Sequence, residues 1–254
     1  AEAARNTACT GARPMAITNC LNFGNPERND VMYQMHQCMR GMAHACKKLG
    51  TPVVSGNVSL YNETRGVAIY PTPVVGMVGL IKDVKRHCTA GFKDEGDAVF
   101  LLGDPGADLS IGSSEYLELV HGEVRGTQTI DLPAEKRLHN LLIRAIGRGL
   151  LRSAHDCSDG GLAVALAESC IIGGRGFKAT LPVNGRLDAA LFGEAQSRAA
   201  VSVKPGAART LEEMAFKVGV PVVRIGMVGG GRMVLKGIAD LPVRDLEQAW
   251  NQVL

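Results

Sequence analysis

Three short polar stretches contain the residue types that could do chemistry in this chain. The first stretch covers residues 56–59 (Gly-Asn-Val-Ser). A glycine lets the backbone approach a ligand with no Cβ in the way, and the amide oxygen of Asn57 is a hard ligand that suits Mg²⁺. Ser59 lies two residues further on, so both side chains would project to the same face of a strand. This pattern suits a metal–phosphate pair, although a hydrogen-bonded edge strand or turn would use the same residues.

The second stretch covers residues 155–161 (His-Asp-Cys-Ser-Asp-Gly-Gly), where an expected strand ends and a helix begins. Free N–H groups and the helix dipole favour anions at such a place. Asp156 and Asp159 could hold a Mg²⁺ ion that bridges phosphates, or Asp159 could cap the helix without any ligand. His155 could act as a base or be a structural histidine. Cys157 and His155 do not form a nucleophile pair, because side chains two residues apart need not meet.

The third stretch covers residues 194–198 (Glu-Ala-Gln-Ser-Arg), just before an expected strand. Arg198 could contact a phosphate and Gln196 a polar ligand. A solvated loop with a local ion pair is the alternative. The sequence has no Walker motif and no strand-linked Gly-x-Gly-x-x-Gly, which argues against standard P-loop and Rossmann sites.

The elements that must position these stretches alternate between strands and helices, which indicates α/β or α+β layering. Met32, Met35, Met39 and Met42 recur at helical spacing and predict a buried stripe. We expect a domain boundary near residue 90, which separates domains at 1–90 and 91–254. Strands are expected at residues 14–23, 74–81, 98–102, 176–181, 200–203, 222–227 and 232–235, and helices at about 32–49, 113–121, 134–149, 162–172, 206–218 and 243–253.

Composition sets outer limits on the function. The 254 residues are 46% hydrophobic and 21% charged, which is typical of a folded globular protein. A net charge of +3 with interspersed signs argues against nucleic acid as a partner. No apolar run is long enough to span a bilayer, so no membrane association is expected. The seven cysteines include no Cys-x-x-Cys pair, which argues against zinc and favours a reducing cytoplasm.

The first residues read as the inside of a helix. The chain opens on residues 1–6 (Ala-Glu-Ala-Ala-Arg-Asn) with no initiator Met and no capping residue before them. We therefore expect a piece of a longer protein, with a processed natural start as the alternative.

Taken together, five ordered motifs resemble the phosphoribosylformylglycinamidine synthase family of purine biosynthesis, in its small-subunit form. The resemblance extends over essentially the whole chain. The motifs are residues 16–26 (AITNCLNFGNP), 51–64 (TPVVSGNVSLYNET), 71–76 (PTPVVG), 155–162 (HDCSDGGL) and 194–198 (EAQSR).

The resemblance implies an α/β (α+β) fold that is an AIR-synthase-like two-domain unit. An incomplete N-terminal β-sheet, half of a barrel, would precede a C-terminal layered α/β domain. The family's synthetase subunit has two tandem copies of this unit, and this chain is similar to most of the second copy. In the family the first domains of the two copies pack into a shared β-barrel. A strand missing before Ala1 would leave an exposed sheet edge.

The implied activity is that of an ATP-dependent C–N ligase. The family converts formylglycinamide ribonucleotide to its amidine by phosphorylation of the amide oxygen and displacement of phosphate by glutamine-derived ammonia, so positioning and Mg²⁺ dominate the catalysis. The implied cofactors are ATP and Mg²⁺. The implied partners are a glutaminase subunit, a small accessory subunit and the N-terminal half of the same subunit. The family's catalytic histidines belong to the first copy, so we expect no catalytic residue in this chain and no activity from it alone.

The resemblance also assigns roles in the first stretch. Asn57 looks like a Mg²⁺ ligand through the nucleotide, and Ser59 matches a substrate-contacting position. Gly56 and Asn19 match nucleotide-contacting positions. Many relatives have Asp at position 19, and Asn19 keeps an acceptor oxygen but loses the charge.

In the other two stretches, Asp156, Asp159 and Gln196 would serve an auxiliary, structural nucleotide and Mg²⁺ site related to the active site by pseudosymmetry. Two alternatives remain open. The chain could be a non-catalytic scaffold that nucleotide stabilises and that docks the glutaminase. It could also be another member of the superfamily, such as aminoimidazole ribonucleotide synthetase or a hydrogenase-maturation protein.

Overall fold

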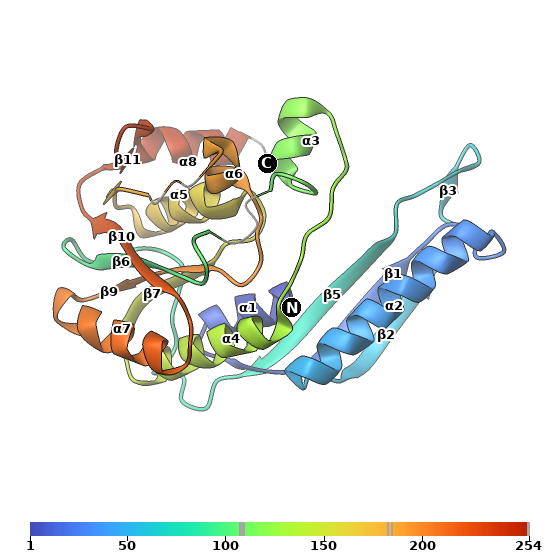
Figure 1. The fold of residues 1–254 in the computed structure, drawn as a ribbon, viewed down its shortest axis with the longest axis horizontal. Coiled ribbons are helices and arrows are strands. Elements are labelled where there is room, and N and C mark those ends of the chain that lie inside the picture. The colour runs from blue at the N-terminus through green and yellow to red at the C-terminus, as the bar shows by residue number, and fades with distance from the viewer. Residues whose placement is uncertain (107–109, 182, 184, 253–254) are drawn as a thin grey trace. The chain divides into compact units, whose positions relative to one another are not determined.

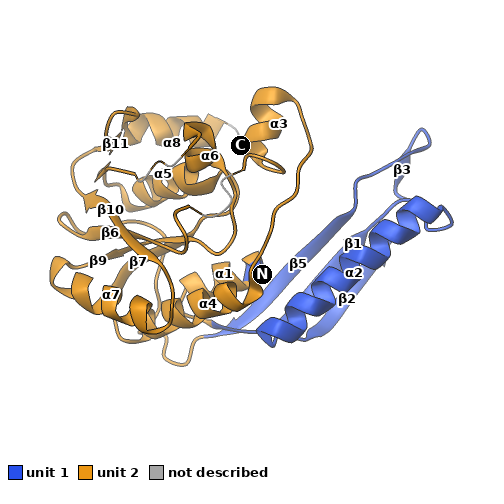
Figure 2. Ribbon diagram, viewed as in Figure 1, with its two compact units in different colours: residues 1, 3, 13–80 blue, residues 2, 4–12, 81–254 orange. Residues whose placement is uncertain are grey.

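The computed structural model describes residues 1–106, 110–181, 183 and 185–252. The chain divides into two compact units (Figure 2). Unit 1 is built mainly from residues 13–80, and unit 2 from residues 4–12 and 81–254. The domain boundary expected near residue 90 stays a prediction.

Unit 1 is a three-stranded sheet with one long helix (Figure 1). The central strand runs parallel to one neighbour and antiparallel to the other. The helix ends at Gly50, whose φ of 79° is left-handed, as expected for a glycine that stops a helix. The elements are β1 (Arg13–Asn22), α2 (Asn29–Leu49), β2 (Val53–Ser59), the short hairpin β3 (Glu63–Thr64) and β4 (Val67–Ala68), and β5 (Thr72–Leu80), in the sheet order β2-β1-β5.

The sheet of unit 1 is open. Strands β2 and β5 are both edges, so the expected incomplete half-barrel is present as a sheet that does not close. Leu21 packs against α2 on one face of the sheet. Val74 and Val78, on the opposite face, are 55% and 59% exposed. Apolar side chains exposed along a sheet are typical of a surface that pairs with another element.

The methionine stripe of α2 is only partly buried. Met35 and Met42 pack against the small core around Phe23, whereas Met32 and Met39 are 46% and 38% exposed. The prediction of a fully buried stripe was wrong for these two residues, because a sheet of three strands covers only part of a helix of 21 residues.

Unit 2 contains a seven-stranded mixed sheet. Every pair of neighbouring strands is antiparallel except β8 and β11, which are parallel. The strands are β6 (Ala98–Leu102), β7 (Leu151–Asp156), β8 (Phe177–Ala179), β9 (Ala199–Val203), β10 (Val222–Val228), β11 (Arg232–Leu235) and β12 (Ala239–Pro242), in the order β12-β11-β8-β10-β6-β9-β7.

Helices cover both faces of this sheet (Figure 1). Helices α4 and α7 lie on one face with α1 beside α4, and α5, α6 and α8 lie on the other. This is the layered α/β arrangement that was expected. The helices are α1 (Glu2–Cys9), α3 (Glu115–His121), α4 (Leu132–Gly147), α5 (Gly161–Gly173), α6 (Leu187–Phe192), α7 (Ala208–Lys217), which follows a 3₁₀ turn (Pro205–Ala207), and α8 (Val243–Gln252).

Strand β6 supplies both cores of unit 2. Phe100 packs into the core beneath α4 and α7, whereas its neighbours Val99 and Leu101 pack into the core beneath α5 and α8. All five residues of β6 are buried, which explains the continuous apolar run in the sequence.

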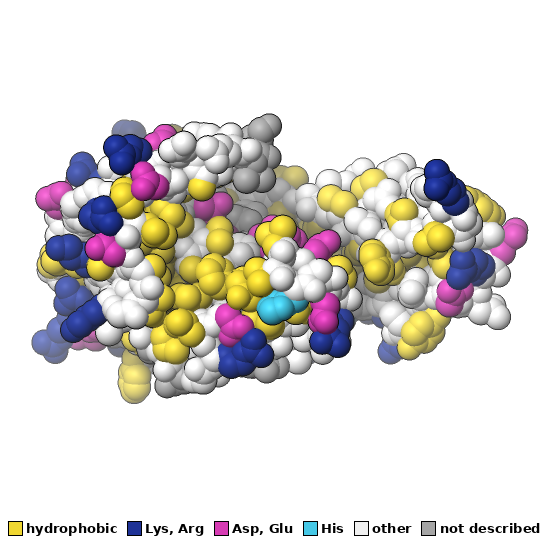
Figure 3. Space-filling model, turned by 90° about the horizontal axis from the view of Figure 1, so that it is seen from above, with side chains coloured by type: hydrophobic (Ala, Val, Ile, Leu, Met, Phe, Trp, Pro, Cys, Tyr) yellow, Lys and Arg dark blue, Asp and Glu magenta, His cyan; other side chains and the backbone are white. Residues whose placement is uncertain are grey.

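On the face of the molecule in Figure 3, basic and acidic side chains are interspersed around hydrophobic ones.

Local signals place α4 as expected. Asp131 caps the helix by accepting a hydrogen bond from the backbone N–H of Ala134 at 3.0 Å, and Pro133 lies in the first turn. Within the described residues, no helix combines the length and the apolar character needed to cross a membrane. All seven cysteines are described, and all are free thiols.

Candidate functional site

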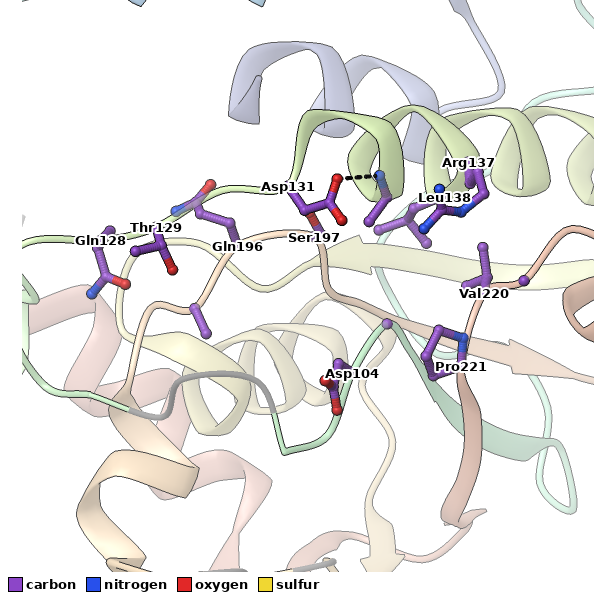
Figure 4. A pocket seen from close by; sticks show the side chains of 14 residues that line it. Asp104, Gln128, Thr129, Asp131, Arg137, Leu138, Gln196, Ser197, Val220 and Pro221 are labelled. Carbon is purple, nitrogen blue, oxygen red and sulfur yellow. Dashed lines mark hydrogen bonds between the residues drawn. The ribbon is translucent and has the colours of Figure 1, made fainter.

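A pocket of about 340 Å³ opens in unit 2, where β6 ends and β10 begins. Figure 4 shows that its labelled side chains come from four separate segments of the chain. These segments follow β6, run into α4, precede β9 and precede β10. The side chains that line it are mostly polar or charged: Asp104, Gln128, Thr129, Asp131, Arg137, Gln196 and Ser197, with Leu138, Val220 and Pro221.

The loop before β9 is held from inside. Arg198 is buried and donates hydrogen bonds to the carbonyls of Gly193, at 2.6 Å, and Ala195, at 3.2 Å. Its guanidinium therefore fastens the loop and does not line the pocket, which argues against the phosphate contact suggested by its position in the sequence. Ser197 has a left-handed φ of 60°, and a Cβ on Gly103 would lie 2.1 Å from its carbonyl oxygen. Backbone held in this way is common at functional sites.

A buried ionic network lies behind this loop. Arg5 of α1 is fully buried, and its Nη1 lies 2.9 Å from Oε1 of Glu135 in α4. Its Nε lies 3.6 Å from Oδ2 of Asp156, the last residue of β7. The amide oxygen of Gln196 accepts from both terminal nitrogens of Arg5 at 3.4 Å. Three distant segments therefore converge on one guanidinium.

Glu135 has further partners in this network besides Arg5. Its carboxylate also contacts Nε2 of His139 at 2.8 Å and accepts from Oγ of Ser197 at 2.5 Å. Burial alone would raise the pKa of Glu135, but the hydrogen bond with His139 and the charge of Arg5 lower it to about 2. Glu135 is therefore ionised over the neutral range.

The start of α5 already holds an anion. Oε1 of Glu194 accepts from the backbone N–H of Gly160 at 2.9 Å and from that of Glu115 at 3.0 Å, so one carboxylate joins the starts of α5 and α3. Burial raises the pKa of Glu194, and these two amides oppose the shift. The N-cap residue of α5 is Gly160, whose N–H is taken by Glu194, and Asp159 is exposed, so the capping alternative for Asp159 was wrong.

Both ring nitrogens of His155 have partners within the chain. Its Nε2 lies 2.8 Å from Oε2 of Glu168, and its Nδ1 lies 2.8 Å from the carbonyl of Asp156. These contacts favour the structural alternative over a catalytic base.

Burial raises the pKa of the Cys9 and Cys157 thiols, so neither is an activated nucleophile.

In unit 1, the lack of a side chain at Gly56 leaves room for the side chain of Asn19. Gly56 and Asn19 are direct partners across β2 and β1. A Cβ on Gly56 would lie 2.3 Å from Oδ1 of Asn19. The close approach predicted for a ligand is thus used, at least in part, by the amide of Asn19.

Asn57 and Ser59 project from β2 on one face, as their spacing predicted. The side-chain amide of Asn57 contacts Sγ of Cys20 at 3.6 Å, and Oγ of Ser59 donates to Oδ1 of Asn62 at 3.1 Å. No group of three or more His, Cys, Asp or Glu side chains that could hold a metal is found in the described part of the chain. The exposed amide oxygen of Asn57 would therefore need ligands from elsewhere to hold Mg²⁺.

The predicted site residues fall into two groups, one in each unit. Asn19, Gly56, Asn57 and Ser59 are neighbours on β1 and β2 of unit 1. In unit 2, Asp156 and Gln196 meet at Arg5, whereas Asp159 lies outside this network.

Sequence reasoning missed Arg5, Glu135 and His139. The four-residue spacing of Glu135 and His139 on an expected helix was an available signal. Nothing in the sequence pairs Arg5 with residues 130 and 151 positions away.

Comparison with known families now places the fold. The profile of the AIR synthase related protein N-terminal domain matches residues 1–81, and that of the C-terminal domain matches residues 94–237. The chain belongs to the AIR synthase related family. The first matched region contains α1 and the open sheet with α2, and the second lies within the layered α/β unit.

Curated relatives of this AIR synthase related chain include the phosphoribosylformylglycinamidine synthase subunit PurL of Thermomicrobium roseum. That protein is 52% identical in an alignment 256 residues long, which covers 99% of this chain and 34% of the relative. The PurL subunit of Anaeromyxobacter sp. strain Fw109-5 is 48% identical in an alignment 262 residues long, which again covers 99% of this chain and 34% of the relative. The chain thus spans about a third of the length of the curated relatives it matches.

Solved structures show the same fold. Thermotoga maritima PurL complexed with FGAR matches with a TM-score of 0.75 and 22% identity, covering 96% of this chain and 41% of the other. A chain of the HypE–HypF complex matches with a TM-score of 0.67 and 18% identity, covering 94% of this chain and 80% of the other. At these identities the likeness concerns the AIR synthase related fold alone.

Proposed function

We propose that this chain is part of an ATP-dependent C–N ligase that converts formylglycinamide ribonucleotide, ATP and glutamine-derived ammonia to formylglycinamidine ribonucleotide. The observation that carries the proposal is the 52% identity to a PurL subunit across 99% of the chain. The likeness to the structures of Thermotoga maritima PurL complexed with FGAR and with ATP supports it. Because the chain spans a third of its relatives, it is inactive alone and completes a site with other segments.

ATP would supply the phosphoryl group that activates the amide oxygen, with Mg²⁺ neutralising its phosphates. In unit 1, the free amide oxygen of Asn57 is a suitable but single Mg²⁺ ligand. Gly56 and Asn19 would contact the nucleotide beside it, and Ser59 would contact the substrate from the same face as Asn57. A shared strand face supports this arrangement, since it lets one ligand touch both side chains.

The same proposal includes the partners. A glutaminase subunit would supply ammonia, a small accessory subunit would complete the complex, and the N-terminal half of the synthetase subunit would supply the catalytic residues. The open sheet of unit 1, with Val74 and Val78 exposed, supports a partner sheet from that half. We place the assembly in the cytoplasm.

The test is a chimaera in which this chain replaces the matching third of Thermomicrobium roseum PurL. We expect ADP release that depends on formylglycinamide ribonucleotide, with ammonium as the nitrogen source. Asn57→Ala should lower kcat/KM and raise the Mg²⁺ requirement. Ser59→Ala should lower kcat/KM at unchanged Tm. The matched control is Val58→Ala, an exposed residue between Asn57 and Ser59 that projects to the opposite face of the same strand. Normal activity in the Ser59 variant, or a folded chimaera without activity, would reject the proposal.

A second candidate function is an auxiliary nucleotide site in unit 2 that stabilises a non-catalytic scaffold. The polar pocket lined by Gln196 favours it. Asp156 and Asp159, the other two residues assigned to it, do not line the pocket. Calorimetric titration of the chain with ADP, with and without Mg²⁺, tests it. Binding that survives in Asn57→Ala but not in Gln196→Ala would support this second site, whereas no binding to the folded chain would reject it.

A further inference from the structure

The network around Arg5 brings together the oxygen types that divalent cations prefer. The carboxylates of Glu135 and Asp156 and the amide oxygen of Gln196 come from α4, the end of β7 and the loop before β9. Carboxylate and amide oxygens are the usual protein ligands of Mg²⁺, Mn²⁺ and Ca²⁺. In this chain, these three side chains surround the guanidinium of Arg5.

The two buried carboxylates require a cation beside them, and the guanidinium of Arg5 is that cation. Glu135 and Asp156 are 0% and 2% exposed, and two buried carboxylates without a cation would carry a large desolvation penalty. Burial lowers the pKa of Arg5, but Glu135 and Asp156 raise it above its ordinary value. Arg5 is therefore a permanent cation at the centre of the cluster.

The fit of this cation is good on one side and loose on the other. Arg5 meets Glu135 at hydrogen-bond distance. Towards Asp156, by contrast, Nε of Arg5 and Oδ2 of Asp156 lie 3.6 Å apart, and neither atom has a hydrogen-bond partner among the described residues. Buried polar atoms are rarely left without partners. Asp156 thus contributes charge to Arg5 without the geometry of a dedicated hydrogen bond.

Arg5 also closes the cluster to other cations. Its side chain is fully buried, and Ala4 and Ala8 on the same helix are buried with it. An ion could reach the three oxygens only by displacing the guanidinium. The arrangement does not fit a resident Mg²⁺ at Asp156, which differs from the expectation drawn from the sequence.

We infer that Arg5 is a built-in cation that takes the place of a divalent metal ion among Glu135, Asp156 and Gln196. The wild-type chain then carries a latent divalent-cation site that α1 keeps closed. Because Gln196 and Ser197 also line the pocket of unit 2, this wall of the pocket is set without metal. A ligand that enters the pocket would meet that wall in the same arrangement whether or not divalent ions are present.

The test compares Mn²⁺ binding to the 254-residue chain and its variants, measured by electron paramagnetic resonance of free Mn²⁺ and by thermal unfolding. Wild type should not bind Mn²⁺ at this cluster, so the Asp156→Asn variant should bind Mn²⁺ no more weakly than wild type. Arg5→Met, which keeps the bulk and removes the charge, should bind Mn²⁺ with a dissociation constant at least about tenfold lower than that of wild type. Its Tm should rise with Mn²⁺ concentration and fall in EDTA. The double variant Arg5→Met/Asp156→Asn should lose this response.

Two outcomes would overturn the inference. One is Mn²⁺ binding to wild type that Asp156→Asn abolishes, because the site would then be open. The other is an Arg5→Met chain that Mn²⁺ neither binds nor rescues. If Arg5→Met is unfolded in EDTA, recovery of its circular dichroism spectrum in Mn²⁺ supports the inference, and failure to recover counts against it. Arg28→Met, at an exposed surface ion pair with Asp30, is the matched control and should leave both readouts unchanged.

Discussion

Gly103 lies directly against the carbonyl of Ser197, so that a Cβ at position 103 would be 2.1 Å from that oxygen. The φ of Gly103 is +98°, in the region that favours glycine. Both facts bear on the pocket, because the two residues line it from different segments. The end of β6 and the loop before β9 can approach this closely only while position 103 has no side chain.

Gly103→Ala should therefore lower the free energy of unfolding by about 2–4 kcal/mol, since it combines backbone strain with a clash against backbone. Urea unfolding of the chain measures the loss. Gly50→Ala is the matched control, because Gly50 has a φ of 79° but nothing within 4 Å of its Cβ position. That control should cost only about 1–2 kcal/mol. Equal losses in the two variants would show that the contact with Ser197 does not matter.

Glu135 should make the chain sensitive to acid. Its pKa falls from an ordinary 4.5 to about 2 in the folded chain. Its contribution to stability is therefore fully present above pH 4.5 and is lost as the pH falls towards 2. With 1.36 kcal/mol per pKa unit, the difference corresponds to about 3 kcal/mol. The free energy of unfolding, measured between pH 5 and 2.5, should lose this slope in Glu135→Gln.

The control for the acid series is Glu213→Gln, which removes a carboxylate from the exposed ion pair with Arg209. This variant should keep the slope of the wild type, because exposed pairs contribute little. A wild-type slope that persists in Glu135→Gln would mean that other carboxylates govern acid unfolding.

His155 should respond to pH in the opposite direction. Burial lowers its pKa, but the hydrogen bond to Glu168 raises it above the ordinary 6.5 on balance. A raised pKa gives stability that is complete below pH 6.5 and is lost as the pH rises through the folded value. Tm should thus decline as the pH rises above 6.5, and Glu168→Gln should flatten this decline. NMR titration of the His155 ring checks the direction, and a value below 6.5 would contradict it.

Glu194 should hold α3 in place. Glu194→Ala removes the acceptor shared by the amides of Gly160 and Glu115, at a cost of about 1–2 kcal/mol as for other lost caps. Hydrogen exchange at these two amides should become faster by at least about tenfold. Glu118→Ala, at an exposed position of the same helix, is the control. Unchanged exchange at Gly160 and Glu115 would show that the bridge is not formed in solution.

The open sheet of unit 1 should promote self-association of the isolated chain. Val78→Lys places a charge on its uncovered face, where Val78 is 59% exposed, so it should reduce association at little cost in stability. Val67→Lys, at a 70% exposed position of the short hairpin, should not. Sedimentation velocity over a range of concentrations measures the difference. Equal association of both variants would place the contact elsewhere.

Much of the fold follows from local signals. Strand β6 was predictable because its five residues are all apolar, and the start of α4 because Asp131 and Pro133 occupy capping positions. The strands and helices predicted beyond residue 90 are present, with ends displaced by a residue or two. Such elements are set by periodicity and by neighbours in the sequence.

The surroundings of the candidate site were less predictable, because they depend on long-range contacts. Nothing near Asp156 in the sequence indicates that Arg5 neutralises it. Likewise, nothing near Gly160 indicates that Glu194 occupies the start of α5. A motif shows which groups are available for binding, but only the folded chain shows which of them already have an internal partner.

Strand β6 has a consequence for how unit 2 unfolds. Its alternate side chains, such as Val99 and Phe100, belong to the two cores on opposite faces of the sheet. Neither helical layer can therefore melt while the other stays intact, because losing one layer exposes half of the strand that the other needs. Unit 2 should unfold in a single cooperative transition, with the amides of β6 exchanging only through global opening.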